Sequence, residues 1–389
     1  MNRDLNMKVN VLPVLTYNFL RLNDSTIDIT GINIDSLESP KADDVPHGVS
    51  FSGGVSFKDA GEVFRAFNER INVNTGVPGD PNGDTSGRDA EQALRTGMGI
   101  DVDKLMIDAD AKCDVYVAEA GVKVEKPIVI RFDCENGSGR LASQVIHAKE
   151  NSEITVIMDY SSDKAAGGFL GISTRLLAEK GAKINLIKTQ LLGDEFLHID
   201  DIGGACFEDG AIKVVSLELG AKKTWTGCYI NLSEKESDFT SDMGYLCRED
   251  HLLDMNYVAD HRGKKTNALM QFKGVLMDKA VKTFRGTIDF KNGSSGSVGD
   301  EQEDALLLSE DVVNKTMPII LCQEEDVDGR HGATIGQLGE DILFYMQTRG
   351  IDEEEAKRIM IKARLDSVAR LIPDAEIMQR VQYYIQNIV

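Results

Sequence analysis

Cys322 and His331 are the two residues of this sequence whose types and spacing best suit metal chemistry. They lie nine positions apart, on either side of an acidic stretch that contains Asp326 and Asp328. Thiolate and imidazole bind iron and zinc once each has lost its proton, and the aspartates are candidate acceptors for the second ring nitrogen. A cysteine after the apolar run 318–321 also fits a buried thiol, and the lone histidine a structural residue. The residues alone leave both interpretations open.

The motifs of several enzyme classes are missing from the sequence. There is no GxxxxGK[ST] phosphate loop, so any use of ATP is expected to belong to another chain. HExxH and GxSxG are missing too, which removes support for a zinc protease or an α/β-hydrolase. The 64 acidic residues include too many possible carboxylate pairs to select one for sugar-polymer cleavage. We therefore expect no enzyme activity, and keep a polysaccharide lyase as an alternative.

Length and charge narrow the possible partners. The chain has 389 residues, and its 64 acidic against 43 basic residues give a net charge of −21. Such a charge repels phosphate backbones and anionic membranes, so we expect neither nucleic acid nor a membrane as partner. Six scattered cysteines without a CxxC pair, and a charged start without a leader-type apolar core, predict reduced thiols and a cytoplasmic location. No apolar run approaches the roughly 18 residues of a membrane span.

Three regions follow one another along the chain. A mixed region, 1–100, contains a possible helix at 62–71 and a loop at 76–87 that is rich in glycine and proline. A region of strands and turns, 101–336, comes next, and a helical region, 337–389, ends the sequence. The β-type runs are VYVAEA (115–120), PIVIRF (127–132), EITVIM (153–158), AIKVVSLEL (211–219), TIDF (287–290) and PIIL (318–321).

Periodicity does not decide how the β region is arranged. A sandwich or barrel is one solution, and a β-helix, whose coils bury their inward side chains against one another, is the other. No repeat of fixed period is evident. In 211–219 the apolar positions shift from Ile212 and Val214 to Val215, Leu217 and Leu219, which predicts a corner or bulge at the middle.

The last fifty residues predict three helices. The first runs from about Glu340 to Arg349 and stops at Gly350, the second is capped by Asp352, and the third starts after Pro373 and Asp374. Their apolar stripes are expected to pack on one another and on the end of the β region, where helices can cap open strands. The stripe residues are Ala356, Ile359, Met360, Ala363, Val368 and Leu371 in the second helix, and Ile377, Val381, Tyr384, Ile385 and Ile388 in the third.

The segment 331–351, HGATIGQLGEDILFYMQTRGI, resembles the SufB/SufD family of iron–sulfur cluster assembly proteins. In it, HGAT, the short link with a glycine and a leucine, and LFY followed by RGI fall at the family spacing. FRG at 284–286 is similar to another family motif, and ALLLSED at 305–311 to the LLLS segment. The segments 115–130 and 12–24 resemble the family more loosely.

The resemblance implies a fold and a set of partners. It implies a right-handed parallel β-helix, flanked by an N-terminal mixed region and a C-terminal α-helical region. In the family, a SufB-type and a SufD-type chain pair through their last coils, and their terminal helices each hold a SufC-type ABC ATPase. Phe344, Tyr345, Arg349 and Ile351 are then candidate contacts with the ATPase. No cofactor is expected to stay on this chain alone, while iron or a cluster passes transiently through the subunit interface.

Two departures from the SufB pattern favour a SufD-like, non-enzymatic subunit. Gly332 follows His331 where SufB-type chains have glutamate, and Glu303 and the region 159–162 stand where SufB-type chains have cysteines. The resemblance makes His331 the residue that faces a SufB cysteine across the interface, whereas Cys322 matches no family ligand. The alternatives are a SufB-like homodimeric scaffold that binds iron through His331 and Cys322, and the polysaccharide lyase.

Overall fold

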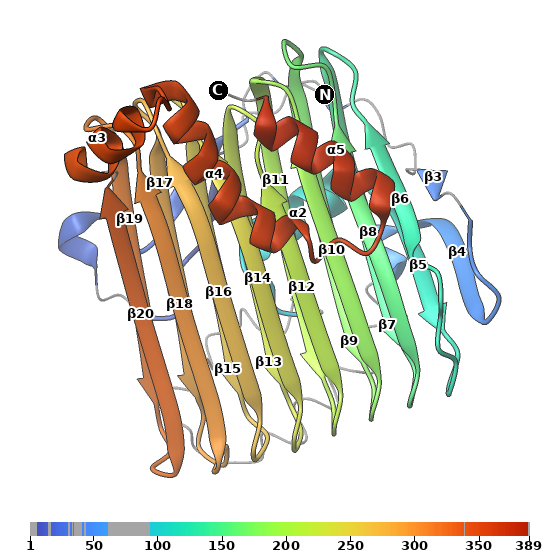
Figure 1. The fold of residues 1–389 in the computed structure, drawn as a ribbon. Helices are drawn as coiled ribbons and strands as arrows, with labels where there is room; N and C mark the ends of the chain where they lie inside the picture. The colour runs from blue at the N-terminus through green and yellow to red at the C-terminus, as the bar shows by residue number, and fades with distance from the viewer. Residues whose placement is uncertain are drawn as a thin grey trace.

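The computed structural model describes residues 6–14, 17–29, 32, 34, 41–42, 44–60, 94–337 and 339–387. Two long sheets dominate this part of the chain, and from β5 onward the chain alternates between them from one strand to the next. Apart from the antiparallel strands β3 and β4 at one end, all neighbours within both sheets run parallel. The molecule is therefore a parallel β-helix of eight coils, as the sequence analysis expected from the family resemblance (Figure 1).

Each coil contributes one strand to each sheet. The first sheet contains, in spatial order, β20 (Val327–Gln337), β18 (Ser297–Leu307), β16 (Asn267–Leu276), β14 (Asp238–Cys247), β12 (Ala211–Glu218), β10 (Lys183–Leu191), β8 (Glu153–Ser161), β6 (Ile128–Asp133) and β3 (Lys41–Ala42). The second contains β19 (Val313–Cys322), β17 (Val281–Phe290), β15 (Leu252–His261), β13 (Lys223–Leu232), β11 (Glu195–Cys206), β9 (Gly167–Ala178), β7 (Ser138–Ala148), β5 (Lys112–Ala118) and β4 (Val49–Ser56).

The coils are of unequal length, which explains why no fixed repeat is visible in the sequence. Paired residues lie 26 positions apart between Leu197 and Lys223, but 32 apart between Val281 and Val313. Inward side chains nevertheless stack in register from coil to coil. One such ladder of buried side chains consists of Ile154, Ile184, Ile212 and Phe239, and burial of these ladders supplies the driving force of the fold.

The corner predicted in 211–219 is wrong. β12 keeps an unbroken register with β10 and β14 along its length. Ile212 and Val214 face the interior, whereas Val215, Leu217 and Leu219 are buried on the outer face, under the C-terminal helices. Both faces of the strand are covered, so its apolar residues need not alternate.

The three C-terminal helices are α3 (Glu340–Thr348), α4 (Glu353–Ala369) and α5 (Ala375–Gln386). Their predicted boundaries are confirmed: the Asp352 carboxylate accepts a hydrogen bond from the Glu355 amide at 2.8 Å, and Asp374 accepts one from Ile377 at 2.9 Å. Gly350 takes the left-handed conformation with φ +85°, which stops α3.

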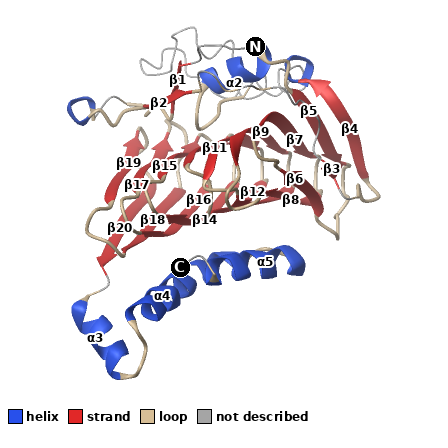
Figure 2. Ribbon diagram, turned by 90° about the horizontal axis from the view of Figure 1, so that it is seen from above, coloured by secondary structure: helices blue, strands red, loops and turns tan. Residues whose placement is uncertain are grey.

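These helices do not cap an end of the β-helix, which corrects the expectation from sequence. α4 and α5 lie across the outer face of the first sheet (Figures 1 and 2). Ile361 and Leu365 of α4, which the predicted stripe omitted, are fully buried there, whereas Ile359 of that stripe is 38% exposed. A sheet face offers a broad apolar surface, and Val215, Leu246 and other outward side chains supply it.

The N-terminal segments pack on the opposite side, against the second sheet (Figure 2). They comprise β1 (Asn6–Val9), a short 3-10 helix (Asn18–Leu20), β2 (Ser25–Asp28) and α2 (Ile100–Asp108). Arg285 of β17 links these segments to the second sheet, since its guanidinium donates to Asp254 of β15 at 2.6 Å and to the Leu22 carbonyl at 2.8 Å. The helix predicted at 62–71 and the loop at 76–87 lie outside the described residues. None of the helices in the described ranges is long and apolar enough to cross a membrane.

Candidate functional site at the open end of the β-helix

The two ends of the β-helix differ. At one end, β3 and β4 pair antiparallel with β6 and β5 and are the terminal strands of the two sheets. At the other end, β19 and β20 are the terminal strands of their sheets, and no strand within the described ranges pairs with their outer edges. Both strands therefore offer rows of backbone N–H and C=O groups, and the interior of the last coil is left uncovered.

His331 belongs to the inward-facing row of β20. It lies in register with Glu301 of β18, and Ile335 lies in register with Ala305, a residue of the interior core. Partners in register point to the same side of a sheet, and residues two apart share a face. The Ile335 side chain is 53% exposed and His331 is exposed as well, because no further coil covers them.

Glu301 is a buried carboxyl next to His331, on a strand about 4.8 Å away. Its side chain points toward Gly286 of β17, where an added Cβ would lie 2.3 Å from a carboxyl oxygen. The residue is only 1% exposed, and neither oxygen has a hydrogen-bond partner among the described residues. Burial, reinforced by the neighbouring Glu303, raises the pKa of Glu301 to about 8. An exposed imidazole thus sits beside a carboxyl that can hold or release a proton near neutral pH.

Glu303 lies two residues farther along β18 and is engaged in an internal network. Its carboxylate forms a buried ion pair with Lys282. The Thr316 hydroxyl donates to it at 2.6 Å and the Tyr245 hydroxyl at 2.9 Å. Because every oxygen of Glu303 is satisfied, this side chain organises the interior and leaves Glu301 as the free carboxyl of the coil.

Cys322 and His331 lie at different positions along the last coil. Cys322 ends β19, in register with Phe290, and its exposed thiol donates to the Glu324 carbonyl at 3.0 Å. His331 is instead the fifth residue of β20. Cys322 and His331 thus both border the open end but come from different strands, and their joint binding of a metal stays a prediction.

The two aspartates proposed as acceptors for His331 have other partners. Asp326 accepts a hydrogen bond from the Ser295 hydroxyl at 2.8 Å, and Asp328 forms an ion pair with Arg330. Glu301 is the carboxyl next to His331 in register, and the sequence analysis did not select it. The alternation of Glu301 and Glu303 within 297–307 could have indicated a shared face, but only the register places that face inside the helix.

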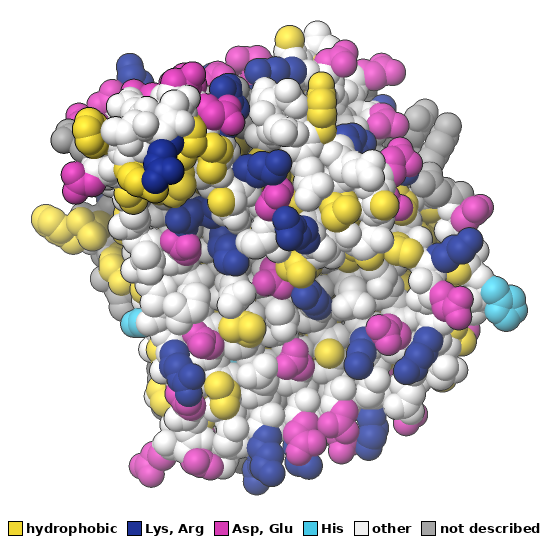
Figure 3. Space-filling view, in the orientation of Figure 1, with side chains coloured by type: hydrophobic (Ala, Val, Ile, Leu, Met, Phe, Trp, Pro, Cys, Tyr) yellow, Lys and Arg dark blue, Asp and Glu magenta, His cyan; other side chains and the backbone are white. Residues whose placement is uncertain are grey.

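α3 follows the last coil and carries two of the predicted partner residues, and the other two follow its C-terminal end. Phe344 and Tyr345 are 69% and 59% exposed, and Arg349 lies over the Tyr345 ring, 5.2 Å from its centroid. Ile351 is half-buried, with its amide bonded to the Met346 carbonyl at 3.1 Å. Hydrophobic side chains gather on the surface where α3 lies (Figure 3). This surface has the composition of a protein contact, with aromatic residues and an arginine.

A protein-family model described as the SufBD core domain of the SUF system for FeS cluster assembly matches residues 132–364. The chain belongs to the SufBD family. It is 25% identical to the iron–sulfur cluster assembly protein SufD of Bacillus subtilis, over 67% of this chain and 60% of that protein. It is 22% identical to SufD of Escherichia coli K12, over 75% of this chain and 71% of that protein.

The similarity makes this chain a SufD-like member of the SufBD family. A third relative, SufD of Plasmodium berghei, is 26% identical over 61% of this chain, but the match covers only 18% of its own length. The chain thus spans less than two thirds of SufD from Bacillus subtilis and from Plasmodium berghei. Glu303, which the sequence analysis expected where SufB-type chains have a cysteine, has its carboxylate bound to Lys282.

Proposed function

We propose that this chain is a non-enzymatic SufD-like subunit that pairs with a SufB-type subunit through its last coil. The observation that carries this proposal is the open end formed by β19 and β20. Edge strands with free backbone groups associate by adding a strand from another chain, and a second β-helix would also cover inward side chains such as Ile335, which is 53% exposed. At the opposite end the terminal strands β3 and β4 run antiparallel to their neighbours, and β3 has only two residues.

Iron, or a nascent cluster, is in this proposal a cargo held between the two subunits. His331 supplies an imidazole at the open end, and cysteine thiolates come from the SufB-type partner, because the corresponding position here is Glu303. Glu301 has two roles available to it: it can accept a proton from the ring of His331, or contribute an oxygen ligand. Imidazole and carboxylate both suit iron. Cys322 remains a second candidate ligand, at the turn end of β19.

The motor of the complex is proposed to be a SufC-type ABC ATPase bound to the α3 surface. Phe344, Tyr345, Arg349 and Ile351 are the contact residues that we assign to it. The sequence has no phosphate loop, so this chain depends on another one for ATP hydrolysis. The six cysteines are all free, which supports assembly in a reducing compartment such as the cytoplasm.

Isolation of the chain from its own cells tests the proposal. An affinity-tagged chain, recovered from native lysate and identified by mass spectrometry, is expected to bring down a SufB-type protein and an ABC ATPase. Ile335→Lys, which places a charge on the open end, is expected to lose the SufB-type protein and keep the ATPase. Recovery of a homodimer would support the SufB-like alternative, and turnover of acidic sugar polymers by the chain would support the lyase.

A further inference from the structure

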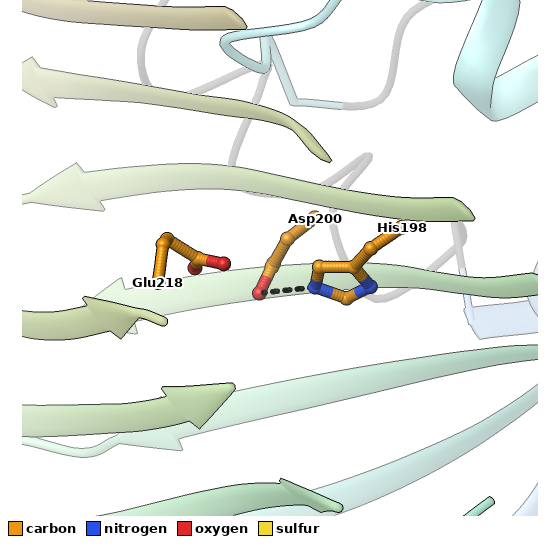
Figure 4. Close-up of side chains that lie close together, drawn as sticks. All are labelled: His198, Asp200 and Glu218. Atoms are coloured by element: carbon orange, nitrogen blue, oxygen red, sulfur yellow. Dashed lines mark ion pairs between the residues drawn. The ribbon is translucent and has the colours of Figure 1, made fainter. Parts of the chain in front are cut away.

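Three ligand-type side chains meet inside the middle of the β-helix, far in sequence from His331. His198 and Asp200 are alternate residues of β11, and Glu218 ends β12 in the facing sheet (Figure 4). All three are buried, at 0%, 1% and 3% exposure. One ligand atom from each lies within 4.8 Å of the others, and this is the one such group of three found in the described ranges.

The hydrogen bonds of His198 fix which ring nitrogen faces the two carboxylates. Its Nδ1 lies 3.0 Å from the Leu170 carbonyl, which can only accept, so Nδ1 carries the proton. In the neutral ring the other nitrogen, Nε2, is then unprotonated. Nε2 therefore presents a lone pair toward Asp200, at 3.9 Å from Oδ2. This arrangement, with one ring nitrogen anchored to a backbone acceptor, is how metal-binding histidines are oriented.

Three buried acceptor atoms in this cluster lack partners. Nε2 of His198, Oδ2 of Asp200 and Oε2 of Glu218 make no hydrogen bond within the described part of the chain. Unsatisfied buried polar atoms are rare because each costs roughly 1–3 kcal/mol. The three atoms converge on one point, and a cation between them would satisfy all three.

The charges around the cluster leave room for such a cation. Lys188 pairs with the other oxygen of Asp200 and also donates to Thr174 at 2.9 Å. It therefore balances one of the two carboxylates. Within the described residues Glu218 forms no ion pair, so a second positive charge beside it would balance its carboxylate.

We propose that His198, Asp200 and Glu218 bind a divalent transition-metal ion inside the β-helix. One imidazole and two carboxylates favour zinc, iron(II) or manganese over calcium or magnesium, which prefer oxygen ligands alone. An ion at about 2.0–2.2 Å from each atom draws the three side chains together and joins the two sheets. The ion binds the folded chain only, so it stabilises the middle coils. This site is independent of the proposed pairing and of His331.

Metal analysis of the purified full-length chain tests this site. The chain is produced in medium that contains zinc, iron(II) and manganese, passed over a gel-filtration column in chelator, and analysed by mass spectrometry for metals. We expect about one equivalent of metal per chain, and less than about a tenth of that in His198→Gln and Glu218→Gln. His261→Gln is the matched control, because His261 is equally buried, with an unpartnered Nε2, but lies outside any such group of three in the described ranges.

Several results would overturn the site. One is a wild-type chain that holds less than half an equivalent of metal. Others are a metal content that is the same in all variants as in the wild type, or a loss in His261→Gln as large as that in His198→Gln. A metal lost in His331→Ala and kept in His198→Gln would place the ion at the open end instead. Where a variant fails to fold by circular dichroism, X-ray absorption of the wild-type chain decides, since sulfur ligands would contradict the proposal and nitrogen and oxygen ligands are expected.

Discussion

At the scale of single residues, Glu301 links the stability of the last coil to pH. Its pKa is about 8 in the folded chain against an ordinary 4.5, because burial disfavours the charge. The folded state therefore holds this proton more tightly than the unfolded state. The stabilising contribution is complete below about pH 4.5 and is lost as the pH rises through about 8.

Glu301→Gln keeps the shape of the protonated side chain and cannot ionise. We expect the variant to be about 1–3 kcal/mol more stable than the wild type at pH 8 and nearly equal to it at pH 5. Urea denaturation of the isolated chain at both pH values measures the difference. Glu325→Gln, at an exposed position, is the control and should change little at either pH. A gain of equal size at pH 5 would contradict the assigned pKa.

His331→Ala tests the imidazole at the open end. His331 is exposed, so the variant should fold with a change in stability below about 0.5 kcal/mol. Cluster formation by the reconstituted complex should fall at least about tenfold if the ring helps to hold iron. The rate is measured by the visible absorbance of the cluster. His47→Ala, also at an exposed position, is the control and should retain the wild-type rate. A wild-type rate in His331→Ala would show that this histidine does not help to hold iron.

Residue types in the sequence indicate His331 but not its neighbour Glu301. A histidine in a family motif can be recognised from the sequence alone. The position of Glu301 beside it depends on the pairing of two strands whose partner residues lie thirty positions apart. The same limit applies to His198, Asp200 and Glu218. Two of these three residues lie two positions apart in one strand, but the third comes from the facing sheet.

At the scale of elements, the residues at which a helix begins and ends are set by its near neighbours in sequence. The surface on which the helix packs is not. Asp352, Asp374 and Gly350 set their boundaries through contacts within four residues, which sequence can reveal. The face on which α4 packs is decided by outward residues of distant strands, chiefly β12, β14 and β16. The stripe predicted for α4 therefore included Ile359 and missed Ile361.

Ile361→Ala should uncouple α4 from the first sheet. Ile361 is fully buried, so its truncation is expected to cost about 2–5 kcal/mol in the free energy of unfolding. Ile359→Ala, on the same helix but 38% exposed, should cost less than about 1 kcal/mol. Urea denaturation followed by circular dichroism compares the two. Equal costs would mean that α4 packs on the sheet through a different face.

Phe344→Ala tests the α3 surface as the ATPase contact. The side chain is 69% exposed, so its loss should leave the stability of the chain nearly unchanged. An aromatic anchor of an interface contributes more than about 1 kcal/mol, so affinity for the ATPase should fall roughly fivefold or more. Titration calorimetry compares the affinity of the variant and of the wild type for the ATPase. Tyr383→Ala of α5 is matched in exposure, at 69%, and an equal effect of both variants would move the contact away from α3.

At the scale of the whole molecule, the β-helix has two different ends, with antiparallel terminal strands at one and parallel terminal strands at the other. Periodicity in the sequence could not select this fold over a sandwich, because coils of 26 to 32 residues blur the repeat. The family resemblance could select it. Neither the periodicity nor the resemblance indicated that the two ends differ, since this difference depends on the antiparallel pairing of β3 and β4 with the first coil.

Hydrogen–deuterium exchange of the chain, alone and in complex with a SufB-type subunit, tests the central claim most directly. Backbone amides on the outer edges of β19 and β20 have no strand partner in the described structure, so they should exchange rapidly in the free chain. In the complex, peptides from 313–337 are expected to gain at least about tenfold protection, while those of β4 and β5 stay unchanged. Unchanged exchange in 313–337, with protection elsewhere, would show that the subunits meet through another surface.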